Sequence, residues 1–333
     1  METPIPFPIA LVFTTLEHVA LALVAALAVL VAACGVTMAI LLRGYIRIIV
    51  HLFLERSQIP GTPDPDARLS GETVEFETAD KVKLRGVFCQ APNAQGRTVI
   101  FCHEYGSNLN SAARYQKFLL PAGFNCFAFD FRGHGQSGNS NGYEPKQWLT
   151  TYEMADLEAA IKYVQGRPDV DPAKIGLFGL SMGACSCICV AGRRDGVKAV
   201  VAEGAFATRQ ILIEGMKRWI SVYAILTPVH PWVPDWFFNW LCRVSMRRAE
   251  EQHQCRFVAI EEYIGKLSPK PLYMIHGEKD SYVSVAHVQR IFNKAKSPKE
   301  LWVVPSARHN EGVRVAGPEY EEKVTTFLRQ HLN

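Results

Sequence analysis

The hydrophobic pattern separates an apolar N-terminal stretch from a longer part in which short apolar runs alternate with amphipathic ones. Residues 19–42 read VALALVAALAVLVAACGVTMAILL and contain no charged side chain. A charge-free run of this length can cross the hydrocarbon core of a bilayer with some tilt. The pattern therefore predicts a transmembrane helix over 19–42, preceded by a short N-terminal segment, residues 1–18.

The stretch that follows has a helical period of its own. Within residues 43–56, RGYIRIIVHLFLER, polar residues recur at every fourth position, and most of the others are Ile, Val, Leu or Phe. This period predicts an amphipathic helix, which either lies on the membrane surface or packs against the rest of the protein. Residues 57–71 contain Pro and Gly without any period and are predicted to form a linker.

Beyond the linker, apolar runs alternate with helical patterns. Two runs, residues 72–80 and 82–90, predict an antiparallel opening pair of strands. Further apolar runs occur at 97–103, 125–131, 174–181, 197–205, 270–278 and 299–305. Amphipathic stretches at 152–166 and 320–332 predict helices. Buried strands that alternate with helices form a mostly parallel sheet with helices on both faces, so we expect one α/β domain over 72–333.

The sequence GLSMG, residues 179–183, lies between a predicted buried strand and a predicted helix of small residues. A Gly-x-Ser-x-Gly at such a junction is typical of a nucleophile elbow, in which a strained turn aims the serine hydroxyl out of the sheet. We therefore predict that Ser181 is a catalytic nucleophile. The alternative is a chance match, in which Ser181 is only a small residue in a tight turn.

A serine nucleophile needs a base, and the base needs a carboxylate that orients it. Ligands of a parallel sheet bind at the carboxyl ends of its strands, so candidates are sought just after those ends. Asp280 follows the strand PLYMI and His309 follows the strand LWVVP, which gives the chain order Ser, Asp, His. Glu203, which ends the strand AVVAE, and Glu278 are alternative acids.

Acyl transfer also needs two hydrogen-bond donors for the developing oxyanion. The backbone N–H of Met182 is one candidate, because it begins the helix after the nucleophile. The other is the N–H of Tyr105, in the loop HEYGSN that follows the strand TVIFC. The glycine-rich turn DFRGHGQSG, residues 130–138, is interpreted as a structural brace for the nucleophile loop. Because the sequence has no glycine-rich phosphate motif and no metal-ligand spacing, we expect neither a cofactor nor a metal.

Together, GLSMG, DFRGHGQSG, HGEKD and SARHNEG resemble the α/β-hydrolase superfamily, in particular its serine hydrolases: esterases, acylglycerol lipases and acyl thioesterases. The resemblance covers about residues 72–332. It implies these roles: nucleophile for Ser181, acid for Asp280, base for His309, and oxyanion donors for Tyr105 and Met182. Many members have Gly after the His of the oxyanion loop, whereas Glu104 follows His103 here.

An insertion over residues 206–269 interrupts the alternation and is predicted to form a helical cap over the site. It contains four of the chain's six tryptophans. Its aromatic residues include Trp219, Tyr223, Trp232, Trp236, Phe237, Phe238 and Trp240. Trp236, Phe237 and Trp240 are predicted to bind the acyl chain of a substrate. The alternative is ordinary packing of the cap helices on the domain.

Charge and cysteine content bear on the compartment and on partners. All 36 Lys and Arg follow residue 42, and Arg43, Arg47 and Arg56 come directly after the apolar run, which predicts a cytoplasmic catalytic domain. The basic residues are too dispersed for nucleic-acid binding, and no aromatic-basic RNA motif is present. Nine cysteines without paired spacing indicate reduced thiols in that compartment. A lipoprotein cleavage site at Cys34, in VAAC, is the alternative topology.

These patterns predict a membrane-anchored serine hydrolase that cleaves carboxylic esters or thioesters through an acyl-enzyme. Its partners would be an acyl ester, as a small molecule or a lipid, and the bilayer; no oligomeric state is predicted. Two alternatives remain open. One is an acyltransferase, in which an alcohol replaces water on the same acyl-enzyme. The other is a non-catalytic protein that uses the fold as a binding scaffold.

Overall fold

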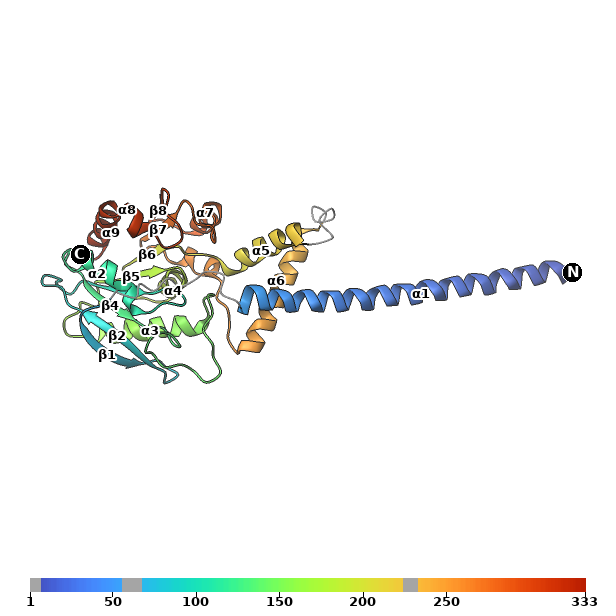
Figure 1. Ribbon diagram of the computed structural model, residues 1–333, viewed down its shortest axis with the longest axis horizontal. Helices are drawn as coiled ribbons and strands as arrows, with labels where there is room; N and C mark the ends of the chain where they lie inside the picture. The colour runs from blue at the N-terminus through green and yellow to red at the C-terminus, as the bar shows by residue number, and fades with distance from the viewer. Residues whose placement is uncertain (1–6, 56–67, 224–232) are drawn as a thin grey trace. The chain divides into compact units, whose positions relative to one another are not determined.

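The structure is a computed structural model that describes residues 7–55, 68–223 and 233–333 (Figure 1). Its contacts divide the chain into two compact units, Met1–Ile49 and Val50–Asn333. Each unit is described by itself.

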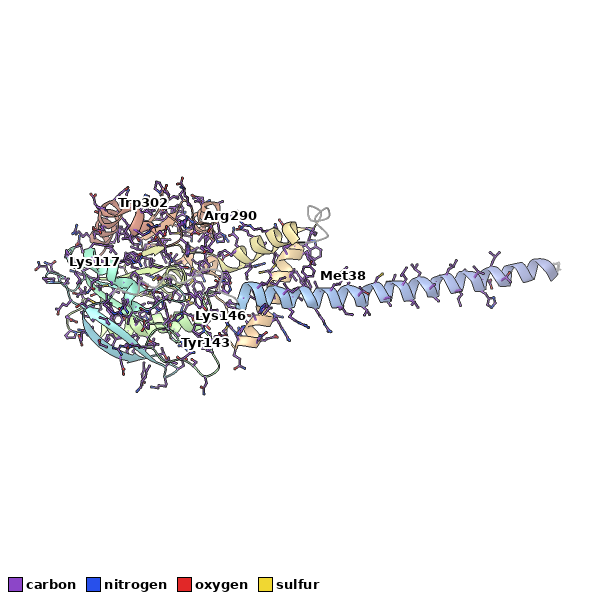
Figure 2. All side chains as sticks on the ribbon, in the orientation of Figure 1. Met38, Lys117, Tyr143, Lys146, Arg290 and Trp302 are labelled. Atoms are coloured by element: carbon purple, nitrogen blue, oxygen red, sulfur yellow. The ribbon has the colours of Figure 1, made fainter. Side chains whose placement is uncertain are left out.

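The first unit is a single long helix, α1 (Phe7–Ile49). Among the described residues, one helical stretch is long and apolar enough to cross a bilayer, residues 15–52, and a signal sequence would meet the same criteria. Its large apolar side chains are exposed from Leu16 to Leu41, Met38 among them (Figure 2), and Leu42 and Ile46 are half-buried. The helix extends beyond the predicted span 19–42 at both ends, because the absence of charge marks a lipid-compatible stretch and not the ends of a helix.

The second unit begins with a short π-helix, η1 (Val50–Glu55), which packs against α6 (Asp235–His253). Val50 and Leu54 are buried. Residues 50–55 of the predicted amphipathic stretch thus contact α6, and the position of residues 43–56 at the membrane surface stays a prediction. Residues 56–67, which comprise the last residue of the predicted amphipathic helix and most of the predicted linker, lie outside the described residues.

An eight-stranded sheet forms the body of this unit, in the order β1-β2-β4-β3-β5-β6-β7-β8. The strands are β1 (Glu72–Glu77), β2 (Lys83–Cys89), β3 (Thr98–Cys102), β4 (Asn125–Phe129), β5 (Ile175–Leu180), β6 (Ala199–Glu203), β7 (Leu272–Gly277) and β8 (Lys299–Val304). β2 pairs antiparallel with β1 and β4, and the remaining neighbouring pairs are parallel. The predicted mostly parallel sheet is therefore confirmed. Every residue of β3, β4, β5 and β6 is buried, which is why their sequences are apolar except at the strand ends, where Thr98, Asn125 and Glu203 lie.

Helices cover both faces of the sheet. They are α2 (Ala113–Leu119), α3 (Thr151–Gln165), α4 (Met182–Ala191), α7 (Val285–Lys294), α8 (Gly312–Ala316) and α9 (Pro318–His331). Phe101 of β3 belongs to a core cluster with residues of α2 and α9, while the next residue, Cys102, meets Cys187 of α4. Because successive strand residues point to opposite faces, α2 and α9 lie on one face and α4 on the other. α3 contacts α4.

Between β6 and β7 the chain leaves the sheet to form two helices, α5 (Thr208–Tyr223) and α6 (Figure 1). These helices contact each other, and an ion pair of 2.5 Å joins Lys217 of α5 to Asp235 of α6. The side chains of Trp219 and Tyr223, and all of Trp232, lie outside the described part of the chain.

The predicted cap, residues 206–269, is longer than this two-helix excursion. After α6 the chain returns to the body, where the Val258 N–H donates to the Leu149 carbonyl at 3.0 Å. The next element, η4 (Ile260–Glu262), contacts α4. Hydropathy indicates that a residue is buried, but it does not show which surface covers that residue. The sequence pattern therefore did not separate the residues after α6 from the predicted cap.

Candidate active site

Ser181 occupies a sharp turn between the end of β5 and the start of α4. Its φ of 51° and ψ of −113° lie in a region that residues other than glycine rarely adopt. A Cβ on Gly179 would lie 2.4 Å from the backbone carbonyl carbon of Gly183, and one on Gly183 would lie 2.2 Å from the Cys102 carbonyl oxygen. Both glycines are therefore needed for the close approach of β5, α4 and β3 that holds the serine in this turn.

The structure brings Ser181, His309 and Asp280 together. His309 Nε2 lies 2.9 Å from Ser181 Oγ, and His309 Nδ1 lies 2.6 Å from Asp280 Oδ2. An ionised carboxylate only accepts hydrogen bonds, so His309 Nδ1 carries the proton and donates it to Asp280. In that tautomer Nε2 accepts the hydroxyl proton of Ser181, so the arrangement can activate the serine as a nucleophile.

Several donors hold Asp280 in its ionised form. Oδ1 accepts the backbone N–H groups of Tyr282 and Val283, both at 2.9 Å, while Oδ2 accepts the imidazole N–H. Burial raises the pKa of Asp280, but the hydrogen bond and charge of His309 and the Val283 amide lower it by more, so the net pKa is below its usual value. At neutral pH the carboxylate stays charged and can stabilise an imidazolium on His309.

Two further residues near Asp280 have different partners. His276, in β7, donates from its buried Nε2 to the Val283 carbonyl at 2.8 Å and lies 3.7 Å from Asp280 Oδ2. Burial lowers the pKa of His276, so its ring is neutral at neutral pH and braces the loop that carries the acid. The sequence pattern did not predict this hydrogen bond from His276 to Val283. The sequence feature that pointed to it was a histidine at the end of a predicted strand. Glu278, an alternative acid, is exposed and accepts the Ser306 N–H at 2.9 Å.

Glu203, the alternative acid at the end of β6, also has partners other than the imidazole. Its Oε1 accepts the Gly312 N–H at 2.8 Å, and its Oε2 accepts the Tyr320 hydroxyl at 2.5 Å. Burial raises the pKa of Glu203. Because both donors come shortly after His309 in the chain, Glu203 ties that segment to the sheet.

The loop after β3 runs alongside the serine turn. His103 fixes the start of this loop: its Nδ1 donates to the Glu104 carbonyl at 2.7 Å, and its Nε2 accepts the Phe131 N–H at 3.1 Å. A Cβ on Gly183 would lie 2.7 Å from the His103 carbonyl oxygen, which shows how closely the loop approaches α4. Tyr105, two residues further on, is thus in a segment that lies next to the turn.

Glu104, which stands where many α/β-hydrolases have glycine, has a buried side chain. Its Oε1 accepts the Ser111 hydroxyl at 3.3 Å, and burial raises its pKa. The N–H of Met182 begins α4 and, as at the start of any helix, has no acceptor within the helix. The oxyanion roles of Tyr105 and Met182 stay predictions.

The glycine-rich turn of residues 130–138 is held by Asp130. The carboxylate accepts the Leu109 N–H at 2.7 Å and the Gln136 N–H at 2.8 Å. A Cβ on Gly135 would lie 2.1 Å from Asp130 Oδ2, so only glycine fits there. The structure therefore puts this brace on the loop that follows β3, whereas the sequence interpretation assigned it to the nucleophile loop.

Trp236, Phe237 and Trp240, the predicted acyl-binding residues, lie on α6. The Phe237 ring centroid is 6.1 Å from that of Trp236 and 5.9 Å from that of Trp240. Phe237 and Trp240 are half-buried, whereas Trp236 exposes 67 % of its surface. The cluster offers apolar surface, and its role in acyl binding stays a prediction.

The cysteines are unpaired, and all but Cys34 are buried. Burial raises the pKa of Cys185 and of Cys242 to about 12, so these thiols supply little thiolate at neutral pH. Within the part of the chain that the structure describes, no group of three or more His, Cys, Asp or Glu side chains is placed to hold a metal ion.

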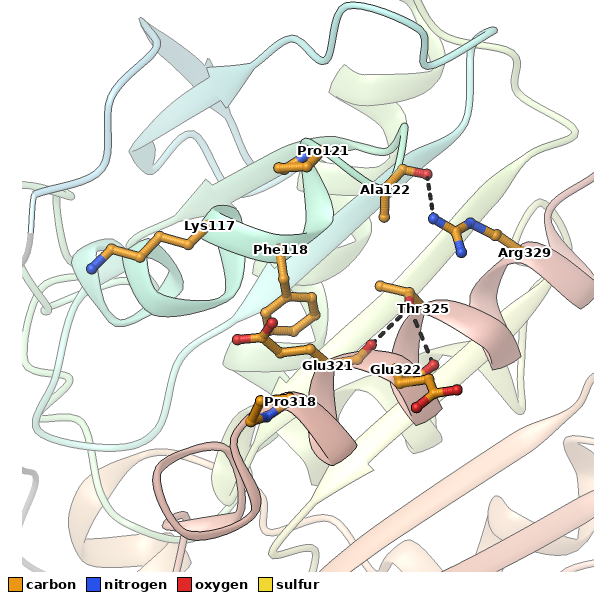
Figure 3. Close-up of a pocket in the computed structure, with 9 residues that line it drawn as sticks. All are labelled: Lys117, Phe118, Pro121, Ala122, Pro318, Glu321, Glu322, Thr325 and Arg329. Atoms are coloured by element: carbon orange, nitrogen blue, oxygen red, sulfur yellow. Dashed lines mark hydrogen bonds between the residues drawn. The ribbon is translucent and has the colours of Figure 1, made fainter.

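A surface pocket of about 420 Å³ lies between α2 and α9 (Figure 3). Its lining residues are Lys117, Phe118, Pro121, Ala122, Pro318, Glu321, Glu322, Thr325 and Arg329. None of them belongs to the site around Ser181, and the mixture of acidic and basic side chains favours no particular ligand charge.

The chain is similar in sequence to proteins from bacteria and plants. Residues 97–254 match the protein family described as alpha/beta hydrolase fold. The uncharacterized protein YfhR of Escherichia coli K12 is 29 % identical over 280 residues, which cover 81 % of this chain and 84 % of that protein. The alpha/beta hydrolase domain-containing protein WAV2 of Arabidopsis thaliana is 23 % identical over 266 residues, which cover 78 % of this chain and 79 % of that protein.

Solved structures show the same similarity. An esterase from Pyrococcus furiosus is 27 % identical to this chain, with a TM-score of 0.61, and the match covers 83 % of this chain and 97 % of that one. The alpha/beta hydrolase GrgF from Penicillium sp. sh18 is 20 % identical, with a TM-score of 0.60, over 79 % of this chain and 99 % of that one.

Proposed function

We propose that this chain, which has the α/β-hydrolase fold, hydrolyses carboxylic esters or thioesters with Ser181 as the nucleophile. The observation that carries the proposal is the hydrogen-bond chain from Ser181 through His309 to Asp280, with distances of 2.9 Å and 2.6 Å. The strained backbone of Ser181 and the low pKa of Asp280 support it. The similarity to the Pyrococcus furiosus esterase indicates the reaction class.

Acylation uses the tautomer that Asp280 imposes on His309. Ser181 Oγ attacks the acyl carbonyl carbon while His309 Nε2 takes the hydroxyl proton, and Asp280 stabilises the imidazolium that forms. The oxyanion of the tetrahedral intermediate accepts hydrogen bonds from the N–H groups of Met182 and Tyr105. The imidazolium then donates its proton to the departing alcohol or thiol, which leaves an ester between Ser181 and the acyl group.

Deacylation repeats these steps with water. His309 Nε2 takes a proton from a water molecule, whose oxygen attacks the acyl carbonyl, and Ser181 regains its proton as the carboxylic acid leaves. An alcohol in place of water would transfer the acyl group from the same intermediate. Product analysis with and without added alcohol distinguishes the two outcomes.

The cap suggests an ester with an apolar acyl chain as the substrate class. The half-buried rings of Phe237 and Trp240 form apolar surface on α6, and burying an acyl chain against such surface favours binding. We place the acyl chain along this part of the cap, with Trp236 at its exposed edge.

We further propose that residues 19–42 anchor the enzyme in a membrane, with the catalytic domain in the cytoplasm. The absence of charge from this run and the exposure of its side chains along α1 support the anchor. Arg43 and Arg47, directly after the run, favour the cytoplasmic orientation by the positive-inside rule.

Turnover of a soluble short-chain ester tests the proposed reaction. Ser181→Ala and His309→Ala should each lower kcat by at least about 10³-fold, the loss expected when one member of such a triad is removed. Ser70→Ala, which changes an exposed serine at the edge of the sheet, is the matched control and should retain wild-type turnover. Circular dichroism and thermal unfolding check that each variant folds. Wild-type turnover in Ser181→Ala would refute the proposal.

A further inference from the structure

One side of α6 combines exposed aromatic and basic side chains. Trp236, Trp240, Arg243 and Arg247 follow one another at intervals of four, three and four residues, which places them along a single line of the helix. Trp236 is 67 % exposed, Arg243 and Arg247 are exposed, and Trp240 is half-buried. The opposite side of α6 is buried and consists of Phe238, Leu241, Cys242, Ser245 and Ala249. We call the line from Trp236 to Arg247 the outer face of α6.

The composition of the outer face is typical of a helix that lies at a membrane surface. Tryptophan rings favour the headgroup region, and arginine side chains hydrogen-bond lipid phosphates there. The neighbouring acids have partners on the protein: Asp235 pairs with Lys217 at 2.5 Å, and Glu251 lies 4.0 Å from Arg248. Arg243 and Arg247 therefore give this face a positive charge that complements anionic lipid.

A short stretch of chain, residues 43–49, joins the proposed span to the second unit. η1 packs against α6, and η1 begins at Val50. The helical residues between Leu42 and Val50 cover about 12 Å at the usual rise per residue. The headgroup layer on each side of a bilayer is roughly 5–8 Å thick. The second unit therefore begins within about one helix width, roughly 10–12 Å with side chains, of this layer.

We propose that the outer face of α6 lies on the anionic lipid surface of the membrane that holds residues 19–42. The exposed ring of Trp236 enters the headgroup layer, and Arg243 and Arg247 bond lipid phosphates, while the half-buried Trp240 stays against the protein. This inference rests on the membrane anchor in the proposed function and deepens that function, because a cap that lies on the leaflet receives its acyl ester from the lipid phase.

Quenching of tryptophan fluorescence by brominated lipid tests the contact directly. The full chain is reconstituted in liposomes of brominated phosphatidylcholine with phosphatidylglycerol, as wild type, Trp236→Phe and Trp302→Phe. Trp302, partly buried on β8 beside Tyr320, is the matched control. We expect the lipid-quenched part of the emission to fall in Trp236→Phe and to stay at its wild-type value in Trp302→Phe. An equal quenched emission in wild type and Trp236→Phe would overturn the inference. That result would mean that the Trp236 ring does not contact lipid, for example because a protein partner or an acyl chain covers it.

Charge removal tests the choice of lipid. In Arg243→Gln/Arg247→Gln, the extra quenching that phosphatidylglycerol gives over phosphatidylcholine alone should be lost, while turnover of a soluble ester stays unchanged. Lys81→Gln/Lys296→Gln removes the same charge from exposed sites elsewhere and should keep the extra quenching. An unchanged response in Arg243→Gln/Arg247→Gln would contradict an anionic partner.

The quenching readout is independent of catalysis, so the two proposals fail separately. Quenching that depends on Trp236 in a chain without esterase activity would leave the surface contact standing and remove the proposed reaction. Esterase activity in the reconstituted chain without that quenching would leave the proposed reaction standing and remove the surface contact. A chain that does not enter the liposomes at all would overturn the anchor on which the inference rests.

Discussion

Asp280 and Glu203 are both buried carboxyl groups near the His309 segment, but their hydrogen bonds differ. Asp280 accepts the imidazole N–H at 2.6 Å and so determines the tautomer of the base. Glu203 accepts the Gly312 N–H and the Tyr320 hydroxyl, so it acts on the position of the chain that follows the base. Under the proposed function, Asp280 therefore orients the base, whereas Glu203 has a structural role.

Replacing each carboxylate by its amide separates these roles. Asp280→Asn removes the acceptor that selects the tautomer, so kcat for a soluble ester should fall by about 10⁴-fold. Glu203→Gln should mainly reduce stability, by about 1–3 kcal/mol, because one of two buried donors loses its acceptor. Steady-state kinetics and urea unfolding measure the two effects. A larger loss of kcat in Glu203→Gln than in Asp280→Asn would identify Glu203 as the acid that orients the base.

The strand ends made Ser181, Asp280 and His309 predictable, because the carboxyl ends of parallel strands meet at one edge of the sheet. The supporting contacts were not predictable in the same way. The bond from Tyr320 to Glu203 and the neutral brace of His276 depend on how side chains pack after the chain has folded. Hydrophobic periodicity carries no information about such pairs.

At the scale of elements, the apolar runs predicted the strands well because a parallel strand covered on both faces is apolar throughout. The cap was harder to delimit. Residues 255–269 are partly apolar like the cap helices, yet they return to the body, where Val258 bonds Leu149. The hydrophobic pattern of a segment shows that the segment is buried. It does not show which other element covers the segment, because that depends on how the whole chain folds.

The proposed acyl binding by α6 predicts how activity depends on the length of the acyl chain. Each methylene buried against the cap contributes about 0.8 kcal/mol, so four extra carbons can add about 3 kcal/mol of binding. Trp240→Ala and Phe237→Ala should therefore lower kcat/KM for octanoyl esters far more than for butyryl esters. Trp236→Ala should also lower kcat/KM more for octanoyl than for butyryl esters, but by a smaller factor, because most of the Trp236 ring is exposed. Equal losses on both esters would mean that these rings only hold the cap together.

At the scale of the whole molecule, the chain joins a helix with exposed apolar side chains to an α/β-hydrolase body. The sequence predicted the apolar core of this helix from its lack of charge. It did not predict the start at Phe7, because residues 7–18 include Glu17 and a proline and lie outside the charge-free run. Helix ends depend on backbone hydrogen bonding and capping, which hydropathy does not measure.

Reporter fusions in a bacterial host test the orientation. With Arg43 and Arg47 on the cytoplasmic side, green fluorescent protein fused after Asn333 should fluoresce, and alkaline phosphatase fused there should be inactive. Arg43→Glu/Arg47→Glu should weaken this preference. An active phosphatase fusion to the wild-type chain would contradict the orientation and favour a lipid-modified or cleaved N-terminus near Cys34.

Labelling with a fluorophosphonate probe, followed by mass spectrometry of tryptic peptides, tests the central claim most directly. The probe reacts with a serine only where a base activates the hydroxyl and donors stabilise the oxyanion. We predict one adduct, on Ser181 in the peptide of residues 175–193, which disappears in Ser181→Ala and after heat denaturation. A folded chain that takes up no probe, or that carries the adduct on another residue, would contradict the account.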